Sequence, residues 1–246
     1  MKGVINGAGW KDIKTVEDFD FLKTVVNESK GTRHKPLQHS EAIDIFNDRL
    51  AASNVVIKEQ YGMLSPNQQK FIYMTKVGDQ QFSDLDFFLG FLSFNDKSRA
   101  VTNLRGTSVF VCSNLTFSKE SMGKKQKHLS HVSDGTASVF DSGIEDFWKY
   151  RDERIAQINR MKEIEIDRNM QGDIILSMMH SNIFGRDPML ISAINKQFEK
   201  PVHDEFIDRS LWHFQNAATE EMKKIGFASR LKTDEELDRI LNQYMN

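Results

Sequence analysis

Residues 71–94 read FIYMTKV-GDQQFSDLD-FFLGFLSF, and this stretch decides the fold. It contains two runs of β-branched and aromatic residues, Phe71 to Val77 and Phe87 to Phe94, on either side of a polar segment that starts with Gly78 and Asp79. Such runs, bounded by turn residues, are typical of β-strands. The connection is too short for the crossover helix that parallel neighbours need, so the two strands are predicted to be antiparallel.

Two more runs of the same kind flank this pair. Val55 to Tyr61 precedes it, and Val101 to Cys112 follows it after a turn at Asn95 and Asp96. Residues 54–114 are therefore predicted to form an antiparallel meander of three to five strands. Helices must cover one face of this sheet, because an apolar face needs a partner layer.

Short helices are predicted before the strands, because apolar residues recur there at helical spacing. The first helix covers Phe19 to Val26, and the second follows Ser40, a candidate N-cap, and extends to Leu50. Gly31 to Gln38 is predicted to be a loop between them.

The C-terminal half is predicted to be helical. Capping-box spacing, a proline in a first turn and apolar periodicity indicate its helices. These signals lie at Ser142 with Glu145, Asp187 with Pro188, Phe206 to Phe214, and Thr233 with Glu236. The predicted fold class is α+β, with a central antiparallel β-meander flanked by N-terminal helices and a helical C-terminal half. We expect residues 1–141 to form the helical start and sheet, and residues 142–246 to form a helical half packed on the sheet, together one folded unit.

Composition and cysteine content limit the classes of protein to which this chain can belong. The chain has 246 residues, 39% of them hydrophobic, which is enough for a substantial core. Its single cysteine, Cys112, excludes an intramolecular disulfide and is predicted to be packed in a strand. The N-terminus lacks the apolar run of a signal peptide, and no stretch of about 18 apolar residues occurs. We expect a soluble protein of the cytoplasm with no membrane partner.

Positive charge is concentrated in one window. From Lys97 to Val132 the chain has seven Lys or Arg residues against one acid, a net charge of +6, whereas the whole chain has a net charge of −2. A local basic stretch points to an anionic partner. The mildly acidic total argues against indiscriminate coating of duplex DNA. The predicted nucleic-acid-binding residues are Arg99, Arg105, Lys119, Lys124, Lys125, Lys127 and His128.

The same window suggests how a strand of DNA would be held. Met122 to His128 has almost no apolar anchor and is predicted to be a mobile finger. Arg99 and Arg105 flank the last hairpin, where their guanidinium groups would reach phosphates or stack on bases. A solvated loop with surface salt bridges is the alternative interpretation.

Aromatic rings are interleaved with these charges. Phe110 and Phe117 lie inside the basic window, and Phe87, Phe88, Phe91 and Phe94 come just before it. Exposed rings would stack on bases, as in single-strand binders. At least half of the last four must belong to the core, because they alternate between the two faces of a strand.

Patterns that would indicate catalysis or cofactors are weak. His128 and His131 have a metal-like spacing but lack the partners of a tetrahedral site. Glu163, Glu165 and Asp167 are predicted to form a solvated surface, because their spacing distributes them over different helix faces. Gly3, Gly7 and Gly9 near the N-terminus are not followed by the Gly-Lys-Ser/Thr motif of a phosphate-binding loop. No catalytic residue, metal or cofactor is predicted.

One further set lies near the C-terminus. Trp212, Asn216 and Thr219 share one helical face. Packing with one buried hydrogen bond explains such a set more simply than a functional site does.

Three stretches carry a family resemblance. VFVCSNL at 109–115 resembles a strand that ends in a Val-Cys-Ser-Asn signature, and LWHFQNAATE at 211–220 resembles a Trp, Asn-Ala and Thr-Glu segment. LSFNDKSRA at 92–100 is similar to an Asn-Ser-His-Asp-Gly-Ser turn, with Asp96 and Ser98 matching and the His and Gly absent. The chain thus resembles, over residues 92–220, the phage and plasmid-like family known as domain of unknown function 932.

The resemblance implies a gene carried by a phage, prophage or plasmid, and brings no agreed activity. The order of a strand meander followed by a long helix is also broadly similar to Rad52-like annealing proteins, an analogy of fold alone.

We therefore expect a phage-encoded, non-catalytic single-stranded DNA-binding protein that assists viral replication, recombination and annealing, or transcription. Its further partners would be a phage or host polymerase and copies of itself in a homo-oligomer. The alternative is a phage protein that binds and inhibits a host defence or polymerase protein. An enzyme of unrecognised type is a third hypothesis.

Overall fold

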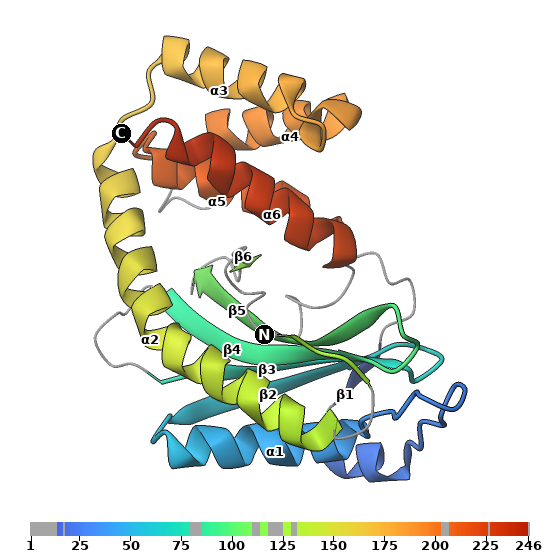
Figure 1. The fold of residues 1–246 in the computed structure, drawn as a ribbon. Coiled ribbons are helices and arrows are strands. Elements are labelled where there is room, and N and C mark those ends of the chain that lie inside the picture. The colour runs from blue at the N-terminus through green and yellow to red at the C-terminus, as the bar shows by residue number, and fades with distance from the viewer. Residues whose placement is uncertain are drawn as a thin grey trace. The chain divides into compact units, whose positions relative to one another are not determined.

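A computed structural model describes residues 14–16, 18–78, 85–109, 114–117, 125–128, 132–202, 207–225 and 227–245 (Figure 1). The described residues among 10–107 and 120–150 form one compact unit, here called the sheet unit. Those among 108–119 and 151–246 form a second, the helical unit.

The sheet unit is built on an antiparallel sheet, so the predicted meander and the α+β class are confirmed. The strands follow one another in the order β1-β2-β3-β4-β5, and a short strand β7 pairs with β5. Their bounds are Lys14–Val16 (β1), Ile57–Leu64 (β2), Lys70–Val77 (β3), Leu85–Phe94 (β4), Arg99–Val109 (β5) and Lys125–Gln126 (β7).

Two helices cover the same face of this sheet (Figure 1). They are α1 (His39–Ala52) and the first half of α2 (Val132–Glu163). Phe46 of α1 and Phe140 of α2 lie 5.0 Å apart between ring centroids, and both contact Phe91 of β4, at 5.4 and 5.0 Å. The apolar alternation of β4 thus turns one set of rings towards both helices.

The helix starts differ from the predicted ones. α1 has Gln38 at its N-cap in place of Ser40, and the Gln38 side chain exchanges hydrogen bonds of 2.9 and 3.0 Å with the backbone of Asn27. α2 begins at Val132 and contains Ser142 in its interior. The predicted capping box at Ser142 is therefore wrong, because the same three-residue spacing also occurs between neighbours inside a helix.

Four α-helices make up most of the helical unit. They are α3 (Arg168–His180), α4 (Pro188–Glu199), α5 (Leu211–Met222) and α6 (Phe227–Asn242). The predicted start at Asp187 is confirmed, because its carboxylate accepts a hydrogen bond of 3.0 Å from the Leu190 amide. Thr233 lies inside α6, where its hydroxyl donates to the Ser229 carbonyl at 2.9 Å, so it does not begin the helix.

The short elements complete this description. η1 (Phe19–Thr24) is a 3-10 helix that ends before Val26, and η3 (Phe184–Arg186) connects α3 to α4. β6 (Asn114–Phe117) belongs to the helical unit, where it contacts α5 and α6.

α5 is the central helix of the helical unit, because it contacts α4, α6 and β6 and is almost wholly buried. Trp212, Asn216 and Thr219 are all buried on it. The Asn216 amide donates to the Trp212 carbonyl at 2.8 Å, and the Thr219 hydroxyl donates to the Asn216 carbonyl at 3.0 Å. These residues thus pack and bond locally. Phe206 and Cys112 lie outside the described residues. Among the helices that the structure describes, none combines the length and the apolar composition that a membrane span requires.

Candidate nucleic-acid interface

Three segments that are far apart in the sequence meet in the sheet unit. They are the loop 28–38, the turn 95–98 between β4 and β5, and residues 125–128. The Lys35 amide donates to the His128 carbonyl at 3.1 Å, which joins the loop to the third segment. The Asn95 side chain accepts from the Leu37 amide at 3.1 Å and donates to the Leu37 carbonyl at 2.8 Å, which joins the loop to the turn.

The predicted finger is anchored where the structure describes it. Lys125 pairs with Thr102 and Gln126 with Val101, so β7 is a short antiparallel strand on β5. This direction carries Lys127 and His128 towards the start of β5, where Arg99 lies. Lys125 and Lys127 are exposed, and no described residue pairs with their amino groups. Lys119 and Lys124, also predicted to bind, lie outside the described residues.

The turn between β4 and β5 holds its cations in defined positions. The Asp96 carboxylate accepts hydrogen bonds from the Ser98 amide at 2.9 Å and from its hydroxyl at 2.5 Å, and pairs with Lys70 at 3.3 Å. Although burial acts in the opposite direction, these contacts lower the pKa of Asp96. Lys97 has a left-handed backbone, with φ of 70°, and its amino group donates to the Lys30 carbonyl.

Arg99 is placed by an aromatic ring. Its guanidinium carbon lies 5.8 Å from the centroid of Phe94, and the Lys70 amino group lies 5.7 Å from the same centroid. A ring contacted by two cations holds them through its quadrupole. Arg99 is therefore positioned against Phe94 at the start of β5.

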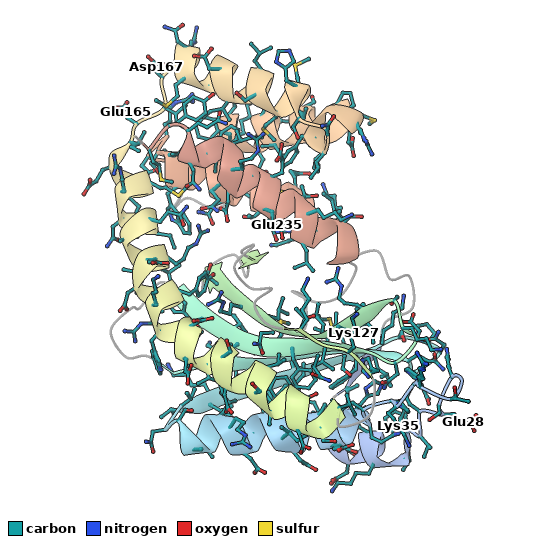
Figure 2. The ribbon with its side chains drawn as sticks, in the orientation of Figure 1. Glu28, Lys35, Lys127, Glu165, Asp167 and Glu235 are labelled. Carbon is teal, nitrogen blue, oxygen red and sulfur yellow. The ribbon has the colours of Figure 1, made fainter. Side chains whose placement is uncertain are left out.

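The cations of these segments form one surface, here called the basic surface. Its members are Lys30, Lys35, Lys97, Arg99, Lys125 and Lys127. Figure 2 shows Lys35 and Lys127 at the same end of the sheet unit, with Glu28 near Lys35. Asp96 lies in the turn next to these cations, and Lys70 pairs with it. Cations that outnumber acids in this way create a positive potential that attracts polyanions.

Arg105 does not belong to this surface. Only 6% of it is exposed, its guanidinium donates to the Asp146 carbonyl at 3.1 Å, and it lies 5.2 Å from the ring centroid of Tyr150. It therefore connects β5 to α2 inside the sheet unit, and a phosphate does not reach it.

Two buried histidines lie beneath the basic surface. The ring centroids of His34 and His128 are 5.8 Å apart, and 5% and 6% of these residues are exposed. Burial, and after it the charges of Lys97 and Lys30, lower the pKa of His34. Burial, with smaller contributions from His34 and His39, lowers the pKa of His128 to about 4. His128 is thus uncharged at neutral pH and adds no charge to the surface.

The predicted stacking rings are not available on β4. Phe87, Phe88, Phe91 and Phe94 are all buried, so the expectation that at least half are core holds for all four. Phe110 and the side chain of Phe117 lie outside the described residues. The basic surface, as described, therefore offers positive charge and hydrogen-bond donors to a ligand.

Sequence reasoning missed the contribution of the loop. Residues 30–35, KGTRHK, contain three exposed cations and no acid, and two of them, Lys30 and Lys35, are members of the basic surface. A search of the amino-acid sequence for short runs of basic residues would have found this segment. Its position next to Lys97 and Lys127 depends on contacts between distant parts of the chain.

The helical unit has a contrasting surface. A hollow of about 450 Å³ is lined by Glu165, Asp167, Asn169, Met170, Asp173 and Tyr244. Figure 2 shows Glu165 and Asp167 beside the start of α3. Both are exposed, as predicted. Three carboxylates make this hollow unfavourable for phosphate. Among the described residues, no three His, Cys, Asp or Glu side chains are grouped so that they could hold a metal ion.

Comparison with protein families extends the resemblance seen in the sequence. A family model described as Domain of unknown function (DUF932) matches residues 13–243, nearly the whole chain. The chain belongs to this family. The DUF932 match includes both the sheet unit and the helical unit, so the two are parts of one family domain. No match was found among curated proteins or solved structures.

Proposed function

We propose that this DUF932 protein binds single-stranded DNA through the basic surface and does so without catalysis. In this proposal the protein is encoded by a phage and works in the host-cell cytoplasm, in replication, annealing or transcription of viral DNA. A polymerase of the phage or host, and further copies of the chain, are its proposed partners.

The observation that supports this proposal is the convergence of cations from three separate segments in a protein whose net charge is −2. Solvated lysines distributed at random would not be concentrated in this way. Lys97 is held by a hydrogen bond to the backbone of Lys30, and Arg99 is ordered against Phe94. Ordered cations lose less side-chain entropy when they contact a phosphate.

The mode of binding follows from what the surface contains. It presents amino and guanidinium groups, and the rings of β4 are buried. Binding would therefore rest on phosphate contacts, with little dependence on base identity. A ligand that bends locally onto one small surface, as a single strand does, suits this arrangement better than a rigid duplex.

Fluorescence anisotropy tests the proposal. Labelled single-stranded and duplex DNA of equal length are titrated with the protein at low and physiological salt. We expect tighter binding to the single strand and a steep loss of affinity with salt. Equal or tighter binding to the duplex would contradict the preference for single strands. The absence of binding to either DNA at low salt would refute the proposal.

A protein partner is the second candidate function. Leu176 and Met179 on α3 are 50% and 57% exposed at a spacing of three residues, and Met189 on α4 is 83% exposed. Exposed apolar side chains of this size are common where proteins bind one another. The corresponding hypothesis is inhibition of a host defence or polymerase protein. It predicts a stable complex with such a protein and no affinity for nucleic acid.

A further inference from the structure

The two buried imidazoles beneath the basic surface have unused hydrogen-bonding capacity. His34 Nε2 and both ring nitrogens of His128 are buried without a hydrogen-bond partner. Buried polar atoms usually have partners, so three orphan nitrogens on two adjacent rings need an explanation. A metal ion is not supported, because no third ligand is grouped with them among the described residues.

The backbone determines how His34 responds to protons. Its Nδ1 atom accepts a hydrogen bond of 3.0 Å from the Lys30 amide, so the neutral ring carries its proton on Nε2. A second proton on His34 would break this bond. His128 has no such bond, so it can accept a proton on either nitrogen at no cost in hydrogen bonds.

Several charged or titratable groups surround the pair. The loop contributes Lys30, the turn contributes Lys97 and Asp96, and α1 contributes His39. The two lysines oppose protonation of His34, and Asp96 favours protonation of His128. Both lysines belong to the basic surface. A polyanion bound there would neutralise part of the positive charge of these lysines. Protonation of the histidine pair would then be less unfavourable.

We propose that binding of nucleic acid to the basic surface is coupled to the uptake of one proton by the His34–His128 pair. This inference rests on the proposed function and specifies how that surface is regulated. Only one proton is taken up, because two charged rings 5.8 Å apart would repel each other. The resulting imidazolium adds a positive charge beneath the bound phosphates. The affinity for nucleic acid therefore rises as the solution becomes mildly acidic.

The number of protons taken up on binding limits how steeply the affinity for nucleic acid can depend on pH. Uptake of one proton changes affinity by at most about tenfold for each pH unit. Lysine side chains and phosphodiesters do not change charge between about pH 5 and 8, so they contribute no slope of their own. Since protonation of the free protein is opposed by burial, we expect binding to tighten about three- to tenfold from about pH 7.5 to 5.5.

The test measures binding of rhodamine-labelled oligothymidine across this pH range at constant ionic strength, because thymine does not titrate there. The double variant His34→Gln with His128→Gln should bind with wild-type affinity at neutral pH and lose the dependence on pH. The control His180→Gln removes an exposed histidine of the helical unit and should keep the wild-type dependence. A double variant that retains the wild-type dependence would overturn the proposal.

Calorimetry of the wild-type protein gives an independent readout that requires no variant to fold. Binding enthalpies measured near pH 6 in two buffers with different ionisation heats yield the number of protons taken up. We expect a positive fraction of one proton. Binding without proton uptake refutes the coupling and leaves the proposed function standing, whereas no binding at any pH refutes both.

Discussion

Three lysines of the basic surface provide the most direct test of its role. Lys35, Lys125 and Lys127 are exposed, and no described residue pairs with their amino groups. Their replacement by glutamine in a triple variant removes three charges and breaks no described contact of a side chain. We therefore expect the triple variant to stay folded and to bind single-stranded DNA more weakly.

The size of the effect follows from the number of phosphates contacted. The basic surface has six cations, which for a single strand gives a salt slope of at most about −4, since each contact contributes about −0.7. Losing three contacts should reduce the magnitude of the slope by about 2. Between about 1 M and about 0.1 M salt, one decade in concentration, that difference in slope weakens binding by up to roughly two orders of magnitude.

The assay is a salt titration of anisotropy with labelled oligothymidine. The matched control replaces Lys162, Lys196 and Lys200 with glutamine. These lysines are exposed on the helical unit, and the control has the same change in net charge as the triple variant. We expect the control to retain nearly the wild-type slope, because contact requires a phosphate next to the amino group.

Two results would refute this reasoning. Equal losses in the two triple variants would show that only net charge matters and that the basic surface has no special role. An unchanged slope in the Lys35, Lys125 and Lys127 variant would show that the DNA lies elsewhere on the protein.

Three predictions concern the fold that supports this surface. Asn95→Ala leaves the amide and carbonyl of Leu37 without their buried partners. It should therefore lower the free energy of unfolding by about 2 to 4 kcal/mol in urea titrations and also weaken DNA binding. An unchanged urea midpoint would contradict this. Gly90→Ala places a Cβ atom on the carbonyl oxygen of Tyr73 and should cost about 3 kcal/mol or more, whereas Gly172→Ala, whose Cβ meets nothing within 4 Å, should be neutral or stabilising by under about 1 kcal/mol. Acid should destabilise the protein between about pH 6.5 and 4, because below the usual histidine pKa the unfolded chain binds protons that the buried rings of the folded protein do not bind. Each such ring lowers the free energy of unfolding by about 1 kcal/mol at about pH 5.5. Urea midpoints that do not change with pH would refute this. The rings whose pKa burial lowers to about 4 are those of His39, His128 and His213.

The site was partly predictable from the sequence. The charge of the window Lys97 to Val132 led to the prediction of Arg99, Lys125 and Lys127 as binding residues, and the structure places all three as exposed or partly exposed cations. The same count included Arg105, which is buried against Tyr150. Charge counting cannot separate the two cases, because a guanidinium has the same charge whether it contacts solvent or packs on a ring.

The strands and the α+β class were determined by the sequence itself. Alternating and aromatic runs such as Phe71 to Val77 specify strands through local sterics and burial, and short turns specify antiparallel pairing. The start of α2 at Val132 could not be predicted from such local signals. The first half of α2 packs on the sheet unit through Phe140, which contacts Phe46 and Phe91, and both of these residues are distant in the sequence.

Only the tertiary structure brings the members of the basic surface together. Its members come from residues 30–35, 97–99 and 125–127, and each segment carries only a modest charge. Two hydrogen bonds of Asn95 with Leu37 and one between Lys35 and His128 join them. Electrostatic potential sums over distance in space and takes no account of distance along the chain, so only folding could make these charges act together.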